Sequence, residues 1–162
     1  MYIYYINLIT IYITVQSKKI TKIKTIYLAS DHAGFDLKEC IKKFLIKKNN
    51  KISDLGPKNK HSVDYPDYAH KLAKKIKKNN EYGILVCGSG IGMIMSANRH
   101  KNVRAALCYN VKSAKLSREH NNANVITVGA RLTQKKIVLK CITTFLATNF
   151  KKGRHLRRVK KI

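Results

Sequence analysis

The run from Gly88 to Gly92 (GSGIG) is the part of the sequence with the clearest chemical potential. Its three glycines allow the backbone to turn its N–H groups inward at the start of an expected helix, whose N-terminus adds partial positive charge. Such a turn can hold a phosphate, a dinucleotide or a developing oxyanion. A dinucleotide fingerprint would need glycine at Met93, and a Walker phosphate loop would need a Gly-Lys-Ser/Thr run that is missing here. The turn indicates an anion site, although close backbone packing explains many glycine turns.

Cys87 directly precedes this turn. A cysteine thiol has a pKa of about 8.5, and a nearby helix N-terminus can lower it enough to populate the thiolate at neutral pH. The alternative interpretation is a small buried apolar residue, as most lone cysteines are. Asp31 and His32 follow the first expected strand, and either could do acid–base chemistry. The alternative for Asp31 is a helix N-cap, and the alternative for His32 is an ordinary surface histidine. Position alone leaves these alternatives open.

The spacing of apolar residues predicts five strands that alternate with helices. The expected strands are 25–30, 51–55, 82–87, 103–108 and 124–128, and helical spacing runs through 37–45, 69–76 and 137–146. Short apolar strands between helices are typical of βα units on a parallel sheet that is covered on both faces. Because the crossovers are right-handed, we expect a Rossmann-like three-layer α/β/α sandwich around a doubly wound five-stranded parallel sheet.

Ligands of such sheets bind at the carboxyl edge of the strands. The residues that follow strands one, two, three and five share that edge: 31–34, 56–65, 87–92 and 129–131. Arg131 is a candidate phosphate ligand among them. Near the end of the chain, Arg154 and Arg158 lie one helical turn apart and could grip a phosphate together, although a solvated basic tail is the usual explanation of such a run.

The composition describes one compact domain with an extreme charge. The 162 residues suffice for a single core, and 34 Lys+Arg against 8 Asp+Glu give a formal net charge of +26. A field of this size attracts nucleic acid or another polyanion. The competing explanation is compositional drift, because an AT-rich coding sequence favours Lys, Asn, Ile and Tyr. We favour drift because the lysines are spread over most helical faces; a phosphorylated ligand benefits from the field in either case.

The four cysteines are widely spaced along the chain. Cys40, Cys87, Cys108 and Cys141 form no CxxC pair and no clustered Cys/His ligand set. This spacing argues against a zinc site and against a secreted disulfide framework. We therefore expect a reducing, cytoplasmic setting, with no metal and no cofactor.

Residues 1–22 are expected to form an N-terminal appendage outside the fold, which leaves 23–162 as the functional domain. The segment 1–16 is apolar and β-branched, lacks a basic n-region and a small-residue cleavage site, and is short for a membrane span. A poor signal peptide, an extra edge strand and a start codon placed too far upstream are the alternatives. We expect no membrane association.

Five strings, in order, carry a resemblance to a known family. They are ASDHAGFDLK from Ala29, SVDYPDYA from Ser62, VCGSGIGM from Val86, SREHNNANVITVGARL from Ser117 and GRHLRRV from Gly153. From about residue 23 to residue 162 the chain resembles ribose-5-phosphate isomerase of the B type, in a family that also includes the galactose-6-phosphate isomerase subunits. Some members use a Glu six residues beyond the cysteine; this chain has Met93 there and resembles the cysteine branch.

The resemblance implies a metal-independent aldose–ketose isomerase of the pentose phosphate pathway, an intramolecular oxidoreductase. It would interconvert ribose 5-phosphate and ribulose 5-phosphate through an enediolate. Cys87 would be the base that moves the proton between C1 and C2, and His120 would open the furanose ring. Asp31 would handle hydroxyl protons, and Ser89 would stabilise the enediolate oxygen together with backbone N–H groups of the glycine turn. The implied substrate-binding residues are His32, Tyr65, Gly88, Gly90, Ile91, Gly92, Asn121, Arg131, Arg154 and Arg158.

The expected topology separates these residues into two groups. Cys87 follows a strand at the carboxyl edge, whereas His120 ends the helix before strand five and Arg158 follows the last helix, near the amino edge. One small sugar phosphate cannot touch both edges of a domain of this size. We therefore expect a homodimer with composite active sites, with a tetramer as the larger alternative.

Two other functions are alternatives. A hexose 6-phosphate isomerase, acting on allose or galactose 6-phosphate, would use the same chemistry in a longer pocket. A basic nucleic-acid-binding protein would need one continuous basic face with exposed aromatic residues. We expect a small-molecule sugar phosphate as the ligand and no specific nucleic-acid partner.

Overall fold

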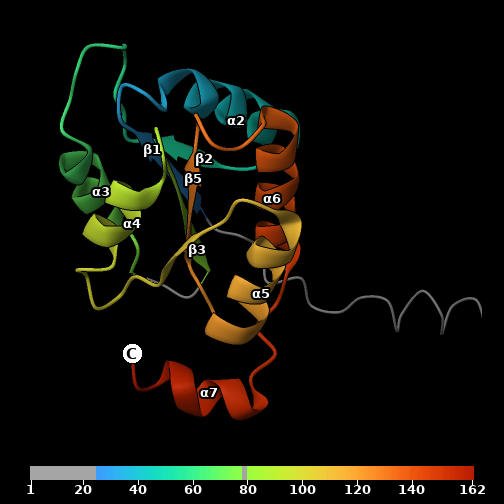
Figure 1. The fold of residues 1–162 in the computed structure, drawn as a ribbon. Helices are drawn as coiled ribbons and strands as arrows, with labels where there is room; N and C mark the ends of the chain where they lie inside the picture. The colour runs from blue at the N-terminus through green and yellow to red at the C-terminus, as the bar shows by residue number, and fades with distance from the viewer. Residues whose placement is uncertain (1–24, 78–79) are drawn as a thin grey trace, which may run out of the picture.

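The computed structural model describes residues 25–77 and 80–162, and the appendage predicted at 1–22 lies outside the described residues. Its strands are β1 (Thr25–Ser30), β2 (Ile52–Asp54), β3 (Glu81–Cys87), β4 (Ala105–Leu107) and β5 (Val125–Gly129). Its helices are α2 (Phe35–Lys47), α3 (Tyr65–Ala73), α4 (Ile91–Ala97), α5 (Val111–Asn121), α6 (Lys135–Ala147) and α7 (Gly153–Val159). Strands and helices alternate from β1 to α6 (Figure 1).

The five strands form one sheet in the order β2-β1-β3-β5-β4, and every pair is parallel. The register places Ile26 of β1 between Ile52 of β2 and Tyr82 of β3. The predicted doubly wound α/β sandwich is therefore confirmed. The strand order reverses between β1 and β3, and ligands of open α/β sheets bind in the crevice outside the carboxyl ends of strands at such a switch point.

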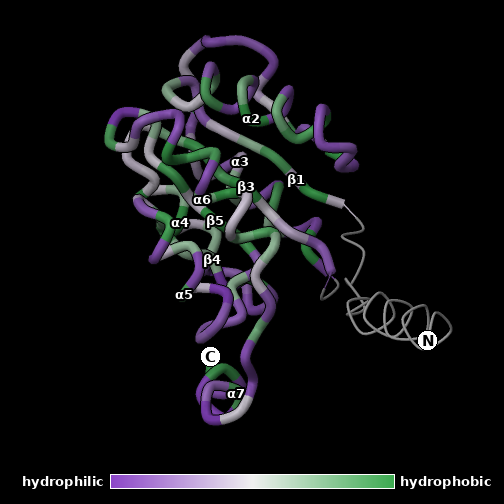
Figure 2. Tube along the Cα trace, turned by 90° about the vertical axis from the view of Figure 1, so that its right-hand side faces the viewer, coloured by the Kyte–Doolittle hydropathy of each residue, from purple (hydrophilic) through white to green (hydrophobic). Residues whose placement is uncertain are grey.

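Two helix layers cover the sheet because its strands carry apolar side chains on both faces. Successive strand residues point to opposite faces. Accordingly, Ile26 and Leu28 of β1 pack with α2, α5 and α6, whereas Ala29 packs with α3 and α4. The two helix layers lie on either side of the sheet in Figure 1. In Figure 2 the trace of α2 alternates between hydrophobic and hydrophilic stretches, as expected for a helix with one buried face.

The two edge strands are shorter than predicted. β2 spans three residues where 51–55 was expected, and β4 spans three where 103–108 was expected. Each pairs with one neighbour, and their residues are half-buried. Before β4 the chain is held by other bonds: the N–H of Val103 donates to the His100 carbonyl (2.9 Å) and the N–H of Arg104 to Asn124 Oδ1 (2.8 Å). The apolar pattern alone does not reveal that these residues leave the ladder.

Helix α7 lies apart from both layers, beyond the end of α5 (Figures 1 and 2). None of its side chains is buried. The N–H of Lys151 donates to the Glu119 carbonyl (3.0 Å), and the Lys151 ammonium lies 3.1 Å from Glu119 Oε2. These bonds connect the segment before α7 to the last turn of α5. In the part of the chain that the structure describes, no helix is both long and apolar enough to span a membrane.

Candidate active site

The glycine turn after β3 is fitted closely against the end of β5. Gly90 has a φ of +83°, a backbone conformation that favours glycine. The carbonyl of Cys87 accepts the Ala130 N–H (2.8 Å). A Cβ atom on Gly129 would lie 2.6 Å from the Ser89 carbonyl oxygen, so only glycine fits there. The backbone of two adjacent strands therefore determines where the turn lies.

Cys87 lies at the carboxyl end of β3 with its thiol directed at this turn. Its side chain is buried, and the N–H of Gly90 donates to Cys87 Sγ at 3.0 Å. This contact fixes the direction of the Cys87 thiol toward the turn. Burial raises the pKa of Cys108 to about 11 and also raises the pKa of Cys141. Those two thiols stay protonated at neutral pH, so they are poor candidates for a base.

Ser89 lies inside the same turn. Its Oγ accepts a hydrogen bond from the N–H of Ile91 at 3.2 Å. Two backbone donors predicted to face the substrate, those of Gly90 and Ile91, are thus directed at the thiol and hydroxyl of the turn itself. They orient the two side chains that would act on the substrate.

Asp31 and His32 follow β1, next to β3 at the switch point. Asp31 is buried; its N–H donates to the Val86 carbonyl (3.1 Å) and its Oδ1 accepts the Gly34 N–H (2.8 Å). The N-cap residue of α2 is Gly34, so Asp31 does not cap this helix. His32 is exposed, and its Nδ1 accepts the Val63 N–H at 3.3 Å. Both residues lie at the same sheet edge as Cys87.

Tyr65 and Arg131 flank the glycine turn. The Tyr65 ring packs over Gly92, where a Cβ would lie 2.6 Å from ring atoms, and Tyr65 is 41% exposed. The guanidinium of Arg131 lies beside Gly88, 3.3 Å from a Cβ built there. The backbone N–H of Arg131 donates to the Gly88 carbonyl (2.9 Å). An exposed aromatic ring and an exposed cation therefore border the thiol-bearing turn.

The remaining predicted residues lie at the other end of the sheet. His120 and Asn121 end α5 just before β5 begins, and Arg154 and Arg158 lie on α7. The ring of His120 stacks on that of His155, with centroids 4.2 Å apart and an interplanar angle of 8°. Desolvation and the neighbouring cations, with His120 first among them, lower the pKa of His155. Stacking and repulsion therefore both favour the neutral form of His155.

His155 was not singled out from the sequence, although it lies in the string that carries both arginines. Arg118, which was also not singled out, connects several segments at this end of the sheet. Its guanidinium is buried and donates to the Thr148 carbonyl (3.2 Å) and the Tyr82 hydroxyl (2.9 Å). Arg118 thereby ties the last turn of α5 to the segment that leads into α7.

One subunit does not bring the two groups together. Cys87 and Asp31 lie at the carboxyl ends of β3 and β1, whereas α7 lies beyond the opposite edge of the sheet (Figure 1). The separation predicted from the topology is therefore present in the chain. Within the described residues, no group of three or more His, Cys, Asp or Glu side chains is placed to hold a metal ion.

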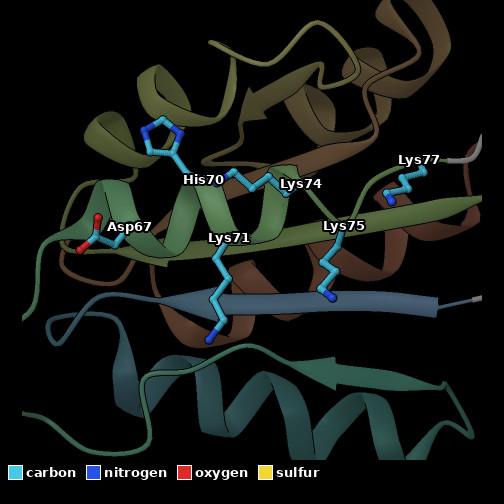
Figure 3. Close-up of a pocket in the computed structure, with 6 residues that line it drawn as sticks. All are labelled: Asp67, His70, Lys71, Lys74, Lys75 and Lys77. Atoms are coloured by element: carbon cyan, nitrogen blue, oxygen red, sulfur yellow. The ribbon is translucent and has the colours of Figure 1, made fainter.

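The hollow of about 540 Å³ along α3 is a different surface feature. It is lined by Asp67, His70, Lys71, Lys74, Lys75 and Lys77. Figure 3 shows that these side chains fan out: His70 points toward α4, while Lys71 and Lys75 point toward the β1–β2 side. His70 Nδ1 lies 2.8 Å from His100 Nε2. Because the lysines do not converge, the hollow is a solvated basic face and offers no built anion site.

The sequence profile of the family described as Ribose/Galactose Isomerase matches residues 26–162. The chain belongs to this family. Three solved relatives cover most of it. Ribose-5-phosphate isomerase B of Thermotoga maritima is 46% identical, with a TM-score of 0.82 over 85% of this chain and 95% of that one. Ribose 5-phosphate isomerase B of Anaplasma phagocytophilum is 45% identical, with a TM-score of 0.82 over 86% of this chain and 96% of that one.

The third relative is ribose-5-phosphate isomerase B of Mycoplasma genitalium with bound ribulose-5-phosphate. It is 44% identical, with a TM-score of 0.81 over 85% of this chain and 92% of that one. These matches confirm the family suggested by the five sequence strings, and they confirm the fold.

Proposed function

We propose that this chain is a ribose-5-phosphate isomerase that interconverts ribose 5-phosphate and ribulose 5-phosphate. The observation that carries the proposal is the Cys87 thiol held 3.0 Å from the Gly90 N–H, at the switch point of a ribose/galactose isomerase fold. Solved relatives over 40% identical are ribose-5-phosphate isomerases B, one of them with ribulose-5-phosphate bound. A base beside an anion-stabilising turn is what an aldose–ketose isomerisation requires.

The reaction needs one base that removes and returns a proton. The Cys87 thiolate removes the C2 proton of the open-chain aldose, and the electron pair moves onto the C1 oxygen to give an enediolate. Asp31 transfers the hydroxyl proton from O2 to O1. The Cys87 thiol then returns its proton to C1, and the ketone forms at C2. The Ser89 hydroxyl, which the Ile91 N–H orients, stabilises the charge on the enediolate oxygen as it moves.

The other end of the substrate needs a ring-opening group and a phosphate grip. His120, with Asn121 beside it, opens the furanose by general acid–base transfer. Arg154 and Arg158 lie four residues apart on α7, so they project from one side of it and suit a phosphate. Arg131 and His32 extend the binding surface at the carboxyl edge.

We propose that a homodimer joins the two groups, with α7 of each subunit reaching the glycine turn of the other. This arrangement is supported by their placement at opposite ends of the sheet and by two exposed apolar side chains on α4, Ile91 (46% exposed) and Met95 (66% exposed). A two-fold axis would then create two composite sites. A tetramer would contain two such dimers.

Subunit mixing tests the composite site. Cys87→Ala and His120→Ala dimers are each expected to be inactive. A heterodimer has one site with both defects and one with neither, so exchange should restore about half of the wild-type activity per heterodimer. No recovery despite exchange demonstrated by native mass spectrometry would refute the composite site.

The reaction itself is tested with purified protein on ribose 5-phosphate, allose 6-phosphate and galactose 6-phosphate. We expect turnover of ribose 5-phosphate with the largest kcat/KM. A larger kcat/KM for a hexose 6-phosphate would make that sugar the assigned substrate. Turnover of none of the three would refute the proposed function.

We further propose that residues 23–162 form the sugar-phosphate isomerase domain and that the protein works in a reducing, cytoplasmic setting. The described fold accounts for every predicted site residue without residues 1–22. The thiol of Cys87 must stay free to act, and all four cysteines are free. A variant that begins at residue 23 should keep the wild-type kcat and KM.

A further inference from the structure

An ion-pair cluster between α2 and β2 takes no part in the chemistry proposed above. The side chain of Lys38 is 0% exposed, and its ammonium lies 3.0 Å from Asp54 Oδ2 and 2.6 Å from Glu39 Oε1. The ammonium of Lys42 lies 2.7 Å from Asp54 Oδ2. A buried ammonium lowers stability unless it is paired and hydrogen-bonded, and apolar replacements of such pairs are often at least as stable. The cluster therefore calls for an explanation other than stability.

The carboxylate of Asp54 connects this cluster to the backbone at the carboxyl edge. Its Oδ1 accepts the Gly56 N–H at 3.0 Å and the Lys38 ammonium at 3.1 Å. The Gly56 carbonyl in turn accepts the N–H of Ser30, the last residue of β1, at 3.1 Å. Gly56 has a φ of +100°, which favours glycine and makes a sharp change of chain direction. Asp54 thus holds the point where the chain leaves the sheet.

The loop that starts at Gly56 runs to two predicted substrate-binding residues. The N–H of Val63 donates to His32 Nδ1 (3.3 Å). Two residues further on, Tyr65 begins α3 and packs its ring over Gly92 of the thiol-bearing turn. The loop 56–64 is therefore anchored at its start by Asp54 and contacts the site at its end.

We propose that Asp54 is a positioning residue that fixes loop 56–64 and thereby places His32 and Tyr65 against the substrate. Lys38 and Lys42 hold its carboxylate in one orientation, so Oδ1 faces the Gly56 N–H. The proposal rests on the proposed function, because it assigns a role in binding the sugar phosphate.

The protonation state of Asp54 agrees with this role. Burial alone would raise the pKa of Asp54, but the hydrogen bonds from Lys42, the Gly56 N–H and Lys38 outweigh burial and lower it. A carboxylate that accepts several hydrogen bonds is held more rigidly than a neutral acid would be. At neutral pH the anchor is therefore ionised.

Three substitutions of Asp54 separate the anchor from the charge. Asp54→Ala removes both. Asp54→Glu keeps the charge near Lys38 and Lys42 but moves the carboxylate one methylene away from the Gly56 N–H. Asp54→Asn removes the charge but keeps an oxygen that can accept this N–H. Glu39→Gln is the matched control, because it weakens the same cluster without touching Gly56.

Steady-state kinetics on ribose 5-phosphate give the first readout. Asp54→Ala and Asp54→Glu are expected to raise KM about tenfold or more with kcat within about threefold, because they loosen groups that bind substrate and transition state alike. Glu39→Gln is expected to stay within about threefold in both constants, and Asp54→Asn to raise KM less than Asp54→Glu, because it keeps the Gly56 contact but loses the lysine pairs that orient the side chain. Asp54→Glu carries the test if Asp54→Ala does not fold. An unchanged KM in Asp54→Glu, or an equal rise in Glu39→Gln, would overturn the proposal.

Hydrogen exchange gives a second readout that does not need turnover. Amides of 56–64 should exchange at least about tenfold faster in Asp54→Glu than in wild type or Glu39→Gln, because their anchor is lost. Equal exchange in all of them would overturn the proposal. If the wild-type protein does not isomerise ribose 5-phosphate, the proposed function is refuted instead. The hydrogen-exchange measurement would still decide whether Asp54 anchors the loop.

Discussion

Gly129 closes β5 directly against the turn that holds Cys87, which makes Gly129→Ala a sharp test of the proposed chemistry. The new Cβ would lie 2.6 Å from the Ser89 carbonyl oxygen and 2.7 Å from the Ser89 carbonyl carbon. Real Cβ contacts start at about 3.0 Å, and both atoms belong to the backbone, so the whole turn has to move by a few tenths of an ångström or more. Overpacking of this kind costs about 1–3 kcal/mol of stability.

The catalytic cost should exceed what the loss of stability explains. Moving Ser89 also moves the Gly90 N–H away from Cys87 Sγ, and a misplacement of about 1 Å can reduce the rate about a hundredfold. Because the overlap requires a shift of a few tenths of an ångström, we expect kcat for ribose 5-phosphate to fall about tenfold at a temperature where the variant is folded. The assay is ribulose 5-phosphate formation under saturating substrate, with the melting temperature recorded for each preparation.

Gly83→Ala is the matched control for this prediction. Its Cβ would lie 2.5 Å from Leu72 Cδ2 and 2.9 Å from Val125 Cγ2, so the overlap is similar. It involves side chains of α3 and β5 instead of backbone, and Gly83 lies in the first half of β3, away from Cys87. It should lose about as much stability and keep kcat within about threefold. Equal kcat values for Gly129→Ala and Gly83→Ala would refute the argument that the Gly129 contact sets the catalytic geometry.

Three further predictions concern the base, metal ions and pH. Cys87→Ala should keep less than about a tenth of the wild-type rate, which corresponds to a barrier increase above about 1.4 kcal/mol. Its affinity for the sugar phosphate, measured by calorimetry, should be largely retained, and Cys108→Ala should keep nearly the wild-type rate. Activity should survive exhaustive chelation, because a thiolate and backbone donors supply the base and the charge stabilisation; loss with EDTA and recovery with a divalent ion would contradict this. Burial, His70 and Lys74 lower the pKa of His100, so the unfolded chain binds more protons below about pH 6.5 and stability falls as pH drops through that region. His100→Gln should flatten the decline of melting temperature between about pH 7.5 and 5, and replacement of the exposed His61 by Gln should not. Identical pH profiles of melting temperature for wild type and His100→Gln would contradict the role of His100.

Much of the fold could be predicted from apolar spacing, because central strands buried on both faces have an unmistakable pattern. Residues 25–30 were predicted as a strand and form β1, and Cys87 ends β3 as expected. The edge strand β4 was overestimated, since side-chain bonds such as that from the Arg104 N–H to Asn124 Oδ1 end the ladder early. Periodicity does not encode such long-range bonds.

The candidate site was predictable where it follows strand ends and not where it depends on contacts. The residues after β1 and β3 were found because topology places them at one edge. The buried Lys38 was missed because a lysine is expected at the surface. A signal existed: Lys38, Ile41 and Leu45 are spaced i, i+3 and i+7, so the lysine occupies a position on the buried face of α2. Its two partner carboxylates, Glu39 on the same helix and Asp54 on β2, explain how it is tolerated.

The two halves of the proposed site are held in different ways, and this has a consequence for how activity depends on assembly. The half around Cys87 is fixed inside the chain by strand ends, by the Gly129 contact and by the loop that Asp54 anchors. The half on α7 has no buried side chain and is tied to its own subunit through Lys151 and the end of α5. In the proposed site, the groups that transfer the proton are thus held within one subunit, whereas the proposed contact of Arg158 with phosphate depends on the partner subunit. Dilution of the dimer should accordingly weaken substrate binding while leaving the Cys87 turn intact.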